Sequence, residues 1–295
     1  MKTLISIIFL IFYLSAHTQQ DTIGINKKML TTAIVTEAVI YTGLISGLRY
    51  AWYKDVPRVP FHYYNDNKGY LQIDKFGHAY GAYAESMICY EWLRKAGVSK
   101  TKSLIYGGSM GLILQTPIEI FDGLYQGWGF SWGDMLANAA GSAFMVGQEW
   151  IFDEQIIVFK FSFSRSDLAE RANGMLGDHP LESLLYDYNG HTYWMSINPF
   201  RNSSFIPKWF NLSLGYSANG MLGEFENRLT WKGRDLPEVE RYRQVLVSLD
   251  IDWTAIETNR PFLRKLFYAM NHIKLPFPAL EYNSLGKWRF HYLYF

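Results

Sequence analysis

The sequence predicts an α+β protein, with a compact four-helix bundle in its N-terminal half and a smaller β-rich region after it. Two observations support this division. Up to Phe152 the chain is dominated by long apolar segments with few charges, which are typical of packed helices. After Phe152, short segments alternate between apolar and polar residues and are rich in aromatic side chains, which is typical of strands. We therefore expect three regions, at residues 1–18, 19–152 and 153–295.

The first region has the features of a secretory signal peptide. Lys2 supplies the positive start, Leu4–Leu14 form the apolar core, and Ala16–Thr18 give a small-residue cleavage pattern. We expect cleavage near Thr18 and export to the cell envelope. A retained anchor is the alternative, which the short apolar run disfavours.

The composition limits the classes of partner. Hydrophobic residues make up 49% of the chain, charged residues 19% and aromatic residues 17%. Tyr and Trp side chains have an apolar ring and a polar group, so they are favoured at a membrane interface, where one part contacts lipid and the other contacts water. The net charge is +1 and the chain has no Lys/Arg-rich run, so we expect no nucleic-acid partner. A membrane lipid or another envelope protein is the expected partner, and the oligomeric state stays open.

Four apolar segments are predicted to form the bundle. Met29–Leu48 carries a single charge and is long enough to cross a bilayer. The second helix is expected from about Asp74 to about Lys95, which lies in a basic last turn. Ser103–Ile118 and Met135–Gln148 carry no charge, as expected of core helices or short membrane segments.

Each of these helices contains two small residues one turn apart. Such pairs let helix backbones approach closely, chiefly in membranes or tight bundles. One pair could arise by chance in a chain with 24 glycines, but four pairs in four apolar helices indicate membrane-like packing. The glycines predicted to pack in this way are Gly43, Gly47, Gly77, Gly81, Gly107, Gly111 and, with Ala137, Gly141.

The β-rich region is predicted to contain four or five strands and one short helix, Arg260–His272. Alternation places Asp250 and Asp252 in one row, which we expect to face solvent. A membrane barrel needs at least eight strands, so we expect a small sheet packed on the helices. The segments with strand character are Ile156–Phe163, Phe210–Tyr216, Gln244–Trp253 and Trp288–Phe295.

Polar side chains in the helical half are few, and they recur at helical spacing. Asp74 and His78 are four residues apart, so the carboxylate can accept from the imidazole and fix its tautomer. Two similar pairs occur on later helices. We expect the bundle to gather these side chains into one polar cluster of Asp74, Lys75, His78, Glu119, Asp122, Asp134 and Asn138.

Such a cluster has several possible roles, which the sequence leaves open. Buried charges can lock helix register. They can also bind a divalent metal, with His78, Glu119, Asp122 and Asp134 as candidate ligands, because carboxylates suit Mg²⁺, Mn²⁺ or Ca²⁺ and imidazole suits Zn²⁺ or Mn²⁺. In a catalytic role, His78 would be a general acid/base oriented by Asp74. Simple surface placement is the remaining alternative. The chain has none of the standard metal or nucleotide motifs.

Three segments carry a family resemblance over about residues 60–150. DKFGHAYGAY (74–83), EIFDG (119–123) and GFSWGDMLANAAG (129–141) resemble the YfiM-like family of predicted periplasmic lipoproteins of unknown function. More remotely, the Asp-Lys-x-x-His and Asp-x-x-x-Asn-x-x-Gly patterns resemble VanZ-like membrane proteins, which are associated with glycopeptide-antibiotic tolerance. The resemblance implies that the polar cluster is a family signature, but it implies no reaction. No cysteine stands at the predicted cleavage site near Thr18, so the lipid anchor is not carried over.

The sequence therefore predicts a membrane-associated envelope protein whose cluster is a structural lock or a site for a lipid or protein partner. The alternative is an envelope enzyme, acid/base or metal-assisted, that acts on a lipid-linked or cell-wall substrate. The host membrane stays open, because the apolar helix favours the inner membrane while the β-rich tail and terminal Phe295 favour the outer.

Overall fold

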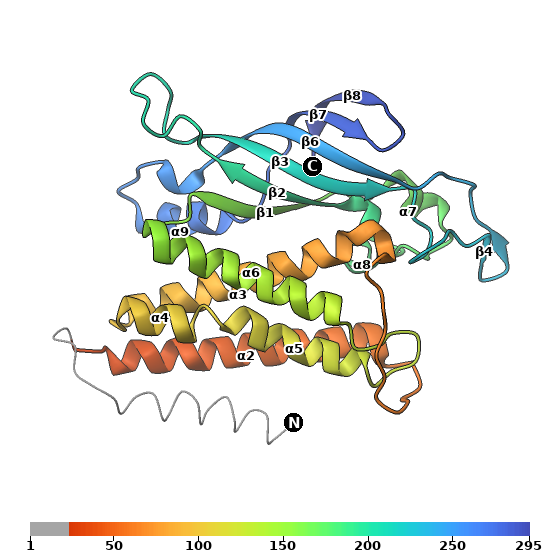
Figure 1. Cartoon of the computed structure of the whole chain (residues 1–295), viewed down its shortest axis with the longest axis horizontal. Helices are drawn as coiled ribbons and strands as arrows, with labels where there is room; N and C mark the ends of the chain where they lie inside the picture. The colour runs from red at the N-terminus through yellow and green to blue at the C-terminus, as the bar shows by residue number, and fades with distance from the viewer. Residues whose placement is uncertain (1–23) are drawn as a thin grey trace.

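The computed structural model describes residues 24–295, so the predicted signal peptide lies outside the described residues. The N-terminal half is helical and the C-terminal part contains an antiparallel sheet, which confirms the predicted α+β class (Figure 1). The long helices are α2 (Lys27–Tyr53), α3 (Ile73–Lys95), α5 (Met110–Asp122) and α6 (Trp132–Phe152), with the short α4 (Lys100–Tyr106) before α5.

The helix boundaries follow local chemistry. The Asn26 side chain accepts from the Met29 amide at the start of α2, and Ser131 Oγ accepts from the Asp134 amide at the start of α6. The third predicted helix is divided into α4 and α5 at residues 107–109, where two glycines and a serine weaken helical propensity.

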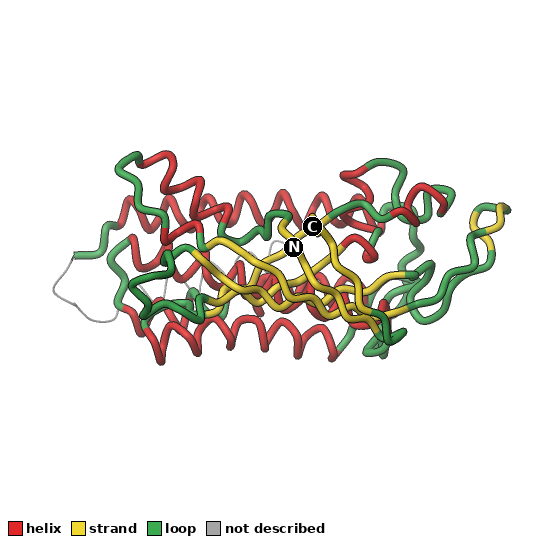
Figure 2. The backbone as a smooth tube through the Cα atoms, turned by 90° about the horizontal axis from the view of Figure 1, so that it is seen from above, coloured by secondary structure: helices red, strands yellow, loops and turns green. Residues whose placement is uncertain are grey.

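The large sheet has the order β1-β2-β3-β6-β7-β8, and every neighbouring pair is antiparallel. Its strands run along the long helices (Figure 2). Two of its strands, β2 and β7, were not predicted. The strands are β1 (Ile157–Phe163), β2 (His191–Ile197), β3 (Phe210–Asn219), β6 (Tyr242–Ile251), β7 (Phe277–Asn283) and β8 (Trp288–Tyr294), and β4 (Thr230–Trp231) and β5 (Arg234–Asp235) form a separate hairpin. The remaining elements are η1 (Gly69–Gln72), α7 (Asp167–Arg171), α8 (Pro180–Tyr186), η2 (Tyr188–Gly190), η3 (Trp253–Ala255) and α9 (Pro261–Met270).

Helices α3 and α6 lie between the sheet and the layer of α2, α4 and α5 (Figure 1). On the sheet side of α3, Phe76 stacks on Tyr216 of β3, with ring centroids 4.6 Å apart. The buried cluster around it contains Tyr83 and Met145 from the helices together with Phe159 and Tyr193 from the sheet. One hydrophobic core therefore joins the helical half to the β-rich region.

The glycines show where α3 is closest to its neighbours. A Cβ added at Gly111 would lie 1.9 Å from the Ala82 carbonyl oxygen, and one at Gly141 would lie 2.0 Å from that of Ala79. Gly107 meets the Tyr90 backbone in the same way, at 2.6 Å. At these three positions only glycine permits the helix backbones to touch.

The other predicted glycine contacts differ. Gly81 faces the Gln115 side chain, and Gly77 faces the Tyr193 hydroxyl of the sheet instead of a helix. Within residues 24–295, an added Cβ at Gly43 or Gly47 would have no atom within 4 Å. Close packing at this pair therefore stays a prediction, because this side of α2 meets no other described element.

The sheet reverses the usual distribution of polarity. On β6, Gln244, Ser248 and Asp250 are buried, whereas Val245 and Val247 are exposed. The prediction that Asp250 faces solvent was wrong, since its carboxylate forms a buried ion pair with Lys160 of β1, with Nζ and Oδ2 2.7 Å apart. On β6 the buried side chains are thus largely polar, and the exposed face is apolar.

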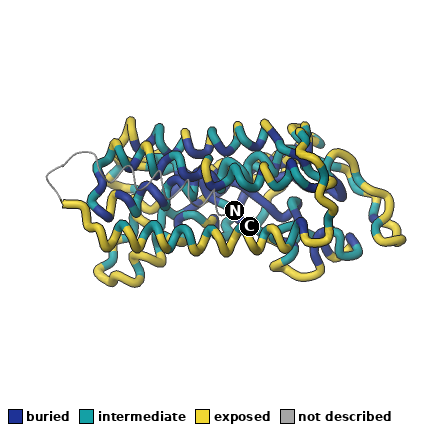
Figure 3. Tube along the Cα trace, turned by 90° about the horizontal axis from the view of Figure 1, so that it is seen from below, coloured by how far each residue is buried: buried dark blue, intermediate teal, exposed yellow. Residues whose placement is uncertain are grey.

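Helix α2 carries the second large apolar surface of the described residues. It is the lowest of the described helices in Figure 1, and exposed residues recur along most of its length (Figure 3). Among the described residues it is the one helix long and apolar enough to cross a membrane, judged by length and composition. Its exposed apolar side chains include Val35, Val39, Ile40 and Leu44.

Candidate functional site

The first turn of α3 begins directly after a strained segment. Tyr70, Leu71 and Gln72 all have positive φ, an uncommon conformation for residues other than glycine. The Tyr70 amide donates to the Glu224 carbonyl at 2.7 Å, and the Tyr216 hydroxyl donates to the Leu71 carbonyl at 2.5 Å. These contacts from the β-rich region fix the direction in which α3 starts, and so the positions of its charged side chains.

Lys75 lies at the centre of the charged groups. Its Nζ is 2.7 Å from Asp66 Oδ1, 2.7 Å from Asp134 Oδ1 and 3.4 Å from Asp74 Oδ2. One ammonium group therefore joins α3 to α6 and to the loop before α3. The nearby carboxylates raise the pKa of Lys75 against the opposing effect of burial.

His78 lies beside Lys75 on the next turn. Its Nε2 is 3.6 Å from Glu119 Oε1, 3.7 Å from Asp134 Oδ1 and 4.0 Å from Asp74 Oδ1, and Nδ1 is 3.2 Å from Asn138 Oδ1. Burial alone would lower the pKa of His78, but the three carboxylates outweigh it and raise the pKa to about 9. His78 is therefore protonated at neutral pH, with Asn138 Oδ1 as an acceptor for the Nδ1 proton.

The carboxylates are held by hydrogen bonds at the start of α6. The Ser131 amide donates to Glu119 Oε2 at 3.1 Å, and Ser131 Oγ donates to Asp66 Oδ1 at 2.6 Å. Burial raises the pKa of Glu119 to about 8 and that of Asp134 to about 7. Lys75 and hydrogen bonds instead hold the pKa of Asp66 below its ordinary value, against the effect of burial. Residues 66, 74, 75, 78, 119, 134 and 138 form what we call the ion cluster.

The membership of the ion cluster differs from the sequence prediction at two residues. Asp66 was not predicted, although it is an acidic residue in a polar, aromatic-rich segment just before α3. Asp122 was predicted, but its carboxylate accepts a hydrogen bond from Tyr53 of α2 and forms no ion pair with a described residue. Burial raises the pKa of Asp122 to about 7. Asp122 therefore links α5 to α2 beside the ion cluster.

Three side chains of the ion cluster have a spacing that could hold a metal ion. Asp74, His78 and Asp134 each offer one ligand atom, and these atoms lie within 4.8 Å of one another. Lys75 already places a positive charge 2.7 Å from Asp134 Oδ1, so a cation there would compete with it. Glu119 Oε1 and Asn138 Nδ2 are buried without a hydrogen-bond partner among the described residues. The donor set fits a hard divalent cation only if the Lys75 side chain moves away.

A comparison with protein families finds a match to part of the chain. The model of a family described as "Predicted periplasmic lipoprotein (DUF2279)" matches residues 62–148, which include the whole ion cluster. Comparisons with curated proteins and with solved structures found no match. The family match agrees with the lipoprotein resemblance in the sequence and gives no support to the VanZ-like one. The chain is thus an exported, envelope-associated protein that is similar, over these residues, to a lipoprotein family of unknown function.

Proposed function

We propose that this chain is a membrane-associated envelope protein in which the ion cluster is a structural lock. The observation that carries the proposal is the position of Lys75 between carboxylates from three different segments: the loop at Asp66, helix α3 at Asp74 and helix α6 at Asp134. A buried charge that is paired in this way fixes how the segments meet. The proposal places the lock in region 19–152, with region 153–295 as the layer that covers α3.

The pairing around His78 supports the same role. The imidazolium faces Glu119, Asp134 and Asp74, and Asn138 accepts at its other nitrogen. Two cationic side chains, Lys75 and His78, thus lie among four carboxyl groups inside the protein. A general base would instead need a neutral imidazole near the working pH.

Membrane association is supported by the surface. Exposed apolar side chains follow α2, including Val39 and Leu44, and the length and composition of this helix suit a membrane. The outward face of the sheet is also apolar at Val245, Val247 and Leu249. Contiguous apolar surface of this kind is typical of proteins that contact lipid or another protein.

An envelope enzyme that acts on a lipid-linked or cell-wall substrate is the second candidate. It is favoured by one observation, the close approach of ligand atoms from Asp74, His78 and Asp134. A divalent cation held there would supply Lewis-acid chemistry. Glu119, whose Oε1 has no hydrogen-bond partner among the described residues, would then be a carboxylate able to hold a proton.

Elemental analysis of the full chain purified in detergent separates the two candidates. The lock predicts less than one equivalent of any divalent metal, and a His78→Ala variant with a lower melting temperature and an unchanged envelope phenotype. One equivalent of metal that is lost in His78→Ala would overturn the lock. Membrane association is tested independently, since a chain released from membranes by an alkaline carbonate wash would contradict it.

A further inference from the structure

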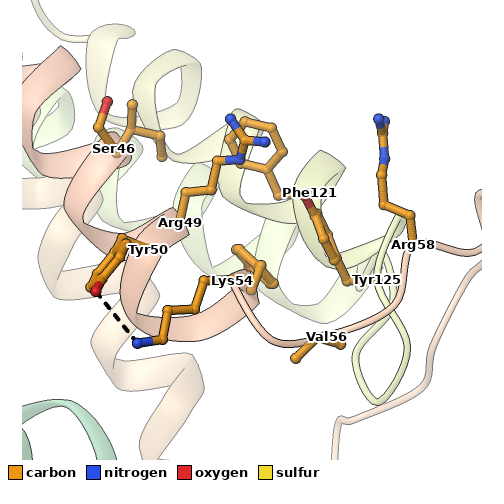
Figure 4. Close-up of a pocket in the computed structure, with 10 residues that line it drawn as sticks. Ser46, Arg49, Tyr50, Lys54, Val56, Arg58, Phe121 and Tyr125 are labelled. Atoms are coloured by element: carbon orange, nitrogen blue, oxygen red, sulfur yellow. Dashed lines mark hydrogen bonds between the residues drawn. The ribbon is translucent and has the colours of Figure 1, made fainter.

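The pocket at the C-terminal end of α2 is separate from the ion cluster. It has a volume of about 530 Å³ and lies between the last turns of α2, the loop after it and the end of α5 (Figure 4). Its lining contains three basic side chains, Arg49, Lys54 and Arg58, and no acidic one. A concave site with this charge is suited to an anion.

Two of the three basic groups are free to bind. The Lys54 ammonium is 3.5 Å from the Tyr50 hydroxyl and 3.8 Å from the exposed Asp55 carboxylate. Within the described part of the chain, Arg49 and Arg58 form no ion pair. Guanidinium groups bind phosphate in a bidentate manner, which makes a phosphate group the best-matched anion for an arginine-lined pocket.

The rest of the lining is mainly aliphatic and aromatic, and its aromatic wall is held by neighbouring side chains. Phe121 and Tyr125 lie between Arg49 and Arg58 in Figure 4. Tyr125 stacks on Tyr53, with ring centroids 4.6 Å apart, and the Tyr53 hydroxyl donates to Asp122. An aromatic wall fixed in this way lowers the cost of ordering the site on binding. The lining thus combines cationic groups for a headgroup with a rigid apolar surface.

The position of the pocket indicates where its ligand comes from. The uncharged, exposed part of α2 around Val39 and Leu44 ends just before Arg49. Basic and aromatic residues at the end of an apolar helix are typical of a membrane–water interface, where they meet anionic headgroups. Acyl chains along the exposed face of α2 would leave a headgroup at the level of the pocket.

We propose that this pocket binds the phosphate group of an anionic phospholipid, whose acyl chains lie along α2. The proposal rests on the membrane association proposed above and adds a defined lipid site to it. Arg49 and Arg58 hold the phosphate oxygens, and the wall of Phe121 and Tyr125 packs against the glycerol and upper chain carbons.

Binding is measured with the full chain in neutral detergent micelles, titrated with phosphatidylglycerol. The double variant Arg49→Gln/Arg58→Gln is expected to bind roughly tenfold more weakly, which corresponds to about 1.4 kcal/mol. The matched control is Arg264→Gln on α9, an exposed arginine at the other end of the molecule (Figure 1), which should bind as the unaltered chain does. An unchanged melting temperature shows that the double variant is folded.

Competition distinguishes the two sources of phosphate. Millimolar inorganic phosphate should not displace the lipid, and phosphatidylcholine should bind more weakly than phosphatidylglycerol. Displacement by phosphate would overturn the lipid assignment, and equal binding by the double variant and the control would overturn the site itself. Because these measurements are made in detergent, they are independent of the carbonate-wash test, so the two proposals can fail separately.

Discussion

Lys75 of α3 and Asp134 of α6 form an ion pair of 2.7 Å between Nζ and Oδ1, at the point where α3 leaves its strained entry segment. Their side chains are 14% and 4% exposed, so water does little to screen the attraction. Removing one partner of such a pair leaves an uncompensated buried charge. This relationship leads to the first prediction.

Replacement of Lys75 by methionine is expected to lower the free energy of unfolding by about 3–5 kcal/mol, because the carboxylates of Asp66 and Asp134 lose their counter-ion. Lys95→Met on the same helix is the control. Its partner Glu91 is four residues away, and the Lys95 side chain is 54% exposed, so the loss should be at most about 0.5 kcal/mol. Chemical unfolding in detergent measures both variants. Equal losses would contradict the lock.

Gly141→Ala tests the close contact between α6 and α3. The new Cβ would lie 2.0 Å from the Ala79 carbonyl oxygen, which only a backbone shift can relieve. We expect a destabilisation of about 1–3 kcal/mol or more. Gly147→Ala on the same helix has no described atom within 4 Å of the new Cβ and should be neutral or stabilising by about 0.5–1 kcal/mol. A stable Gly141→Ala variant would show that the helices are less tightly packed.

Glu85 predicts a dependence of stability on pH. Burial raises its pKa from the ordinary value of 4.5 to about 8. The folded state therefore binds a proton that the unfolded state releases, so the contribution to stability is complete below pH 4.5 and is lost as the pH rises through about 8. Its Oε1 accepts from the Gln115 amide at 3.0 Å, a bond that a glutamine could also make.

We therefore expect Glu85→Gln to reduce the decline in unfolding free energy between pH 5 and pH 8. Unfolding at several pH values measures this slope, with the exposed Glu170→Gln as control. The same slope in Glu85→Gln and the unaltered chain would show that another group titrates.

The buried pair Lys160–Asp250 predicts a non-additive result. The two side chains are 0% and 1% exposed, and the Lys160 ammonium also donates to the Ile251 carbonyl at 2.8 Å. Each of Lys160→Met and Asp250→Leu should cost about 3–5 kcal/mol, whereas the double variant should recover much of that loss. Thermal unfolding of the unaltered chain and of all three variants completes this double-mutant cycle. Strictly additive losses would show that the two residues act independently.

Local sequence patterns were sufficient for most of the helices and for four of the strands. Apolar segments and capping residues such as Ser131 act over a single turn, so they can be recognised without the fold. Strand β7 was missed because Pro278 interrupts its pattern, and the structure has a register irregularity between Phe277 and Ala279. The buried face of β6 was assigned wrongly because alternation gives two faces without saying which one is inside.

The ion cluster shows the same limit of prediction from local sequence patterns. Spacing alone grouped Asp74 with His78, yet their 4.0 Å separation is the longest of the ion-pair contacts of His78. The shorter contacts of Lys75, to Asp66 and Asp134, join residues far apart in the chain. By itself the sequence determined which residues share a helix face, because helical periodicity is local. Only the tertiary structure decided which faces meet, because that depends on the positive-φ turn at residues 70–72 and on the sheet contacts that hold it.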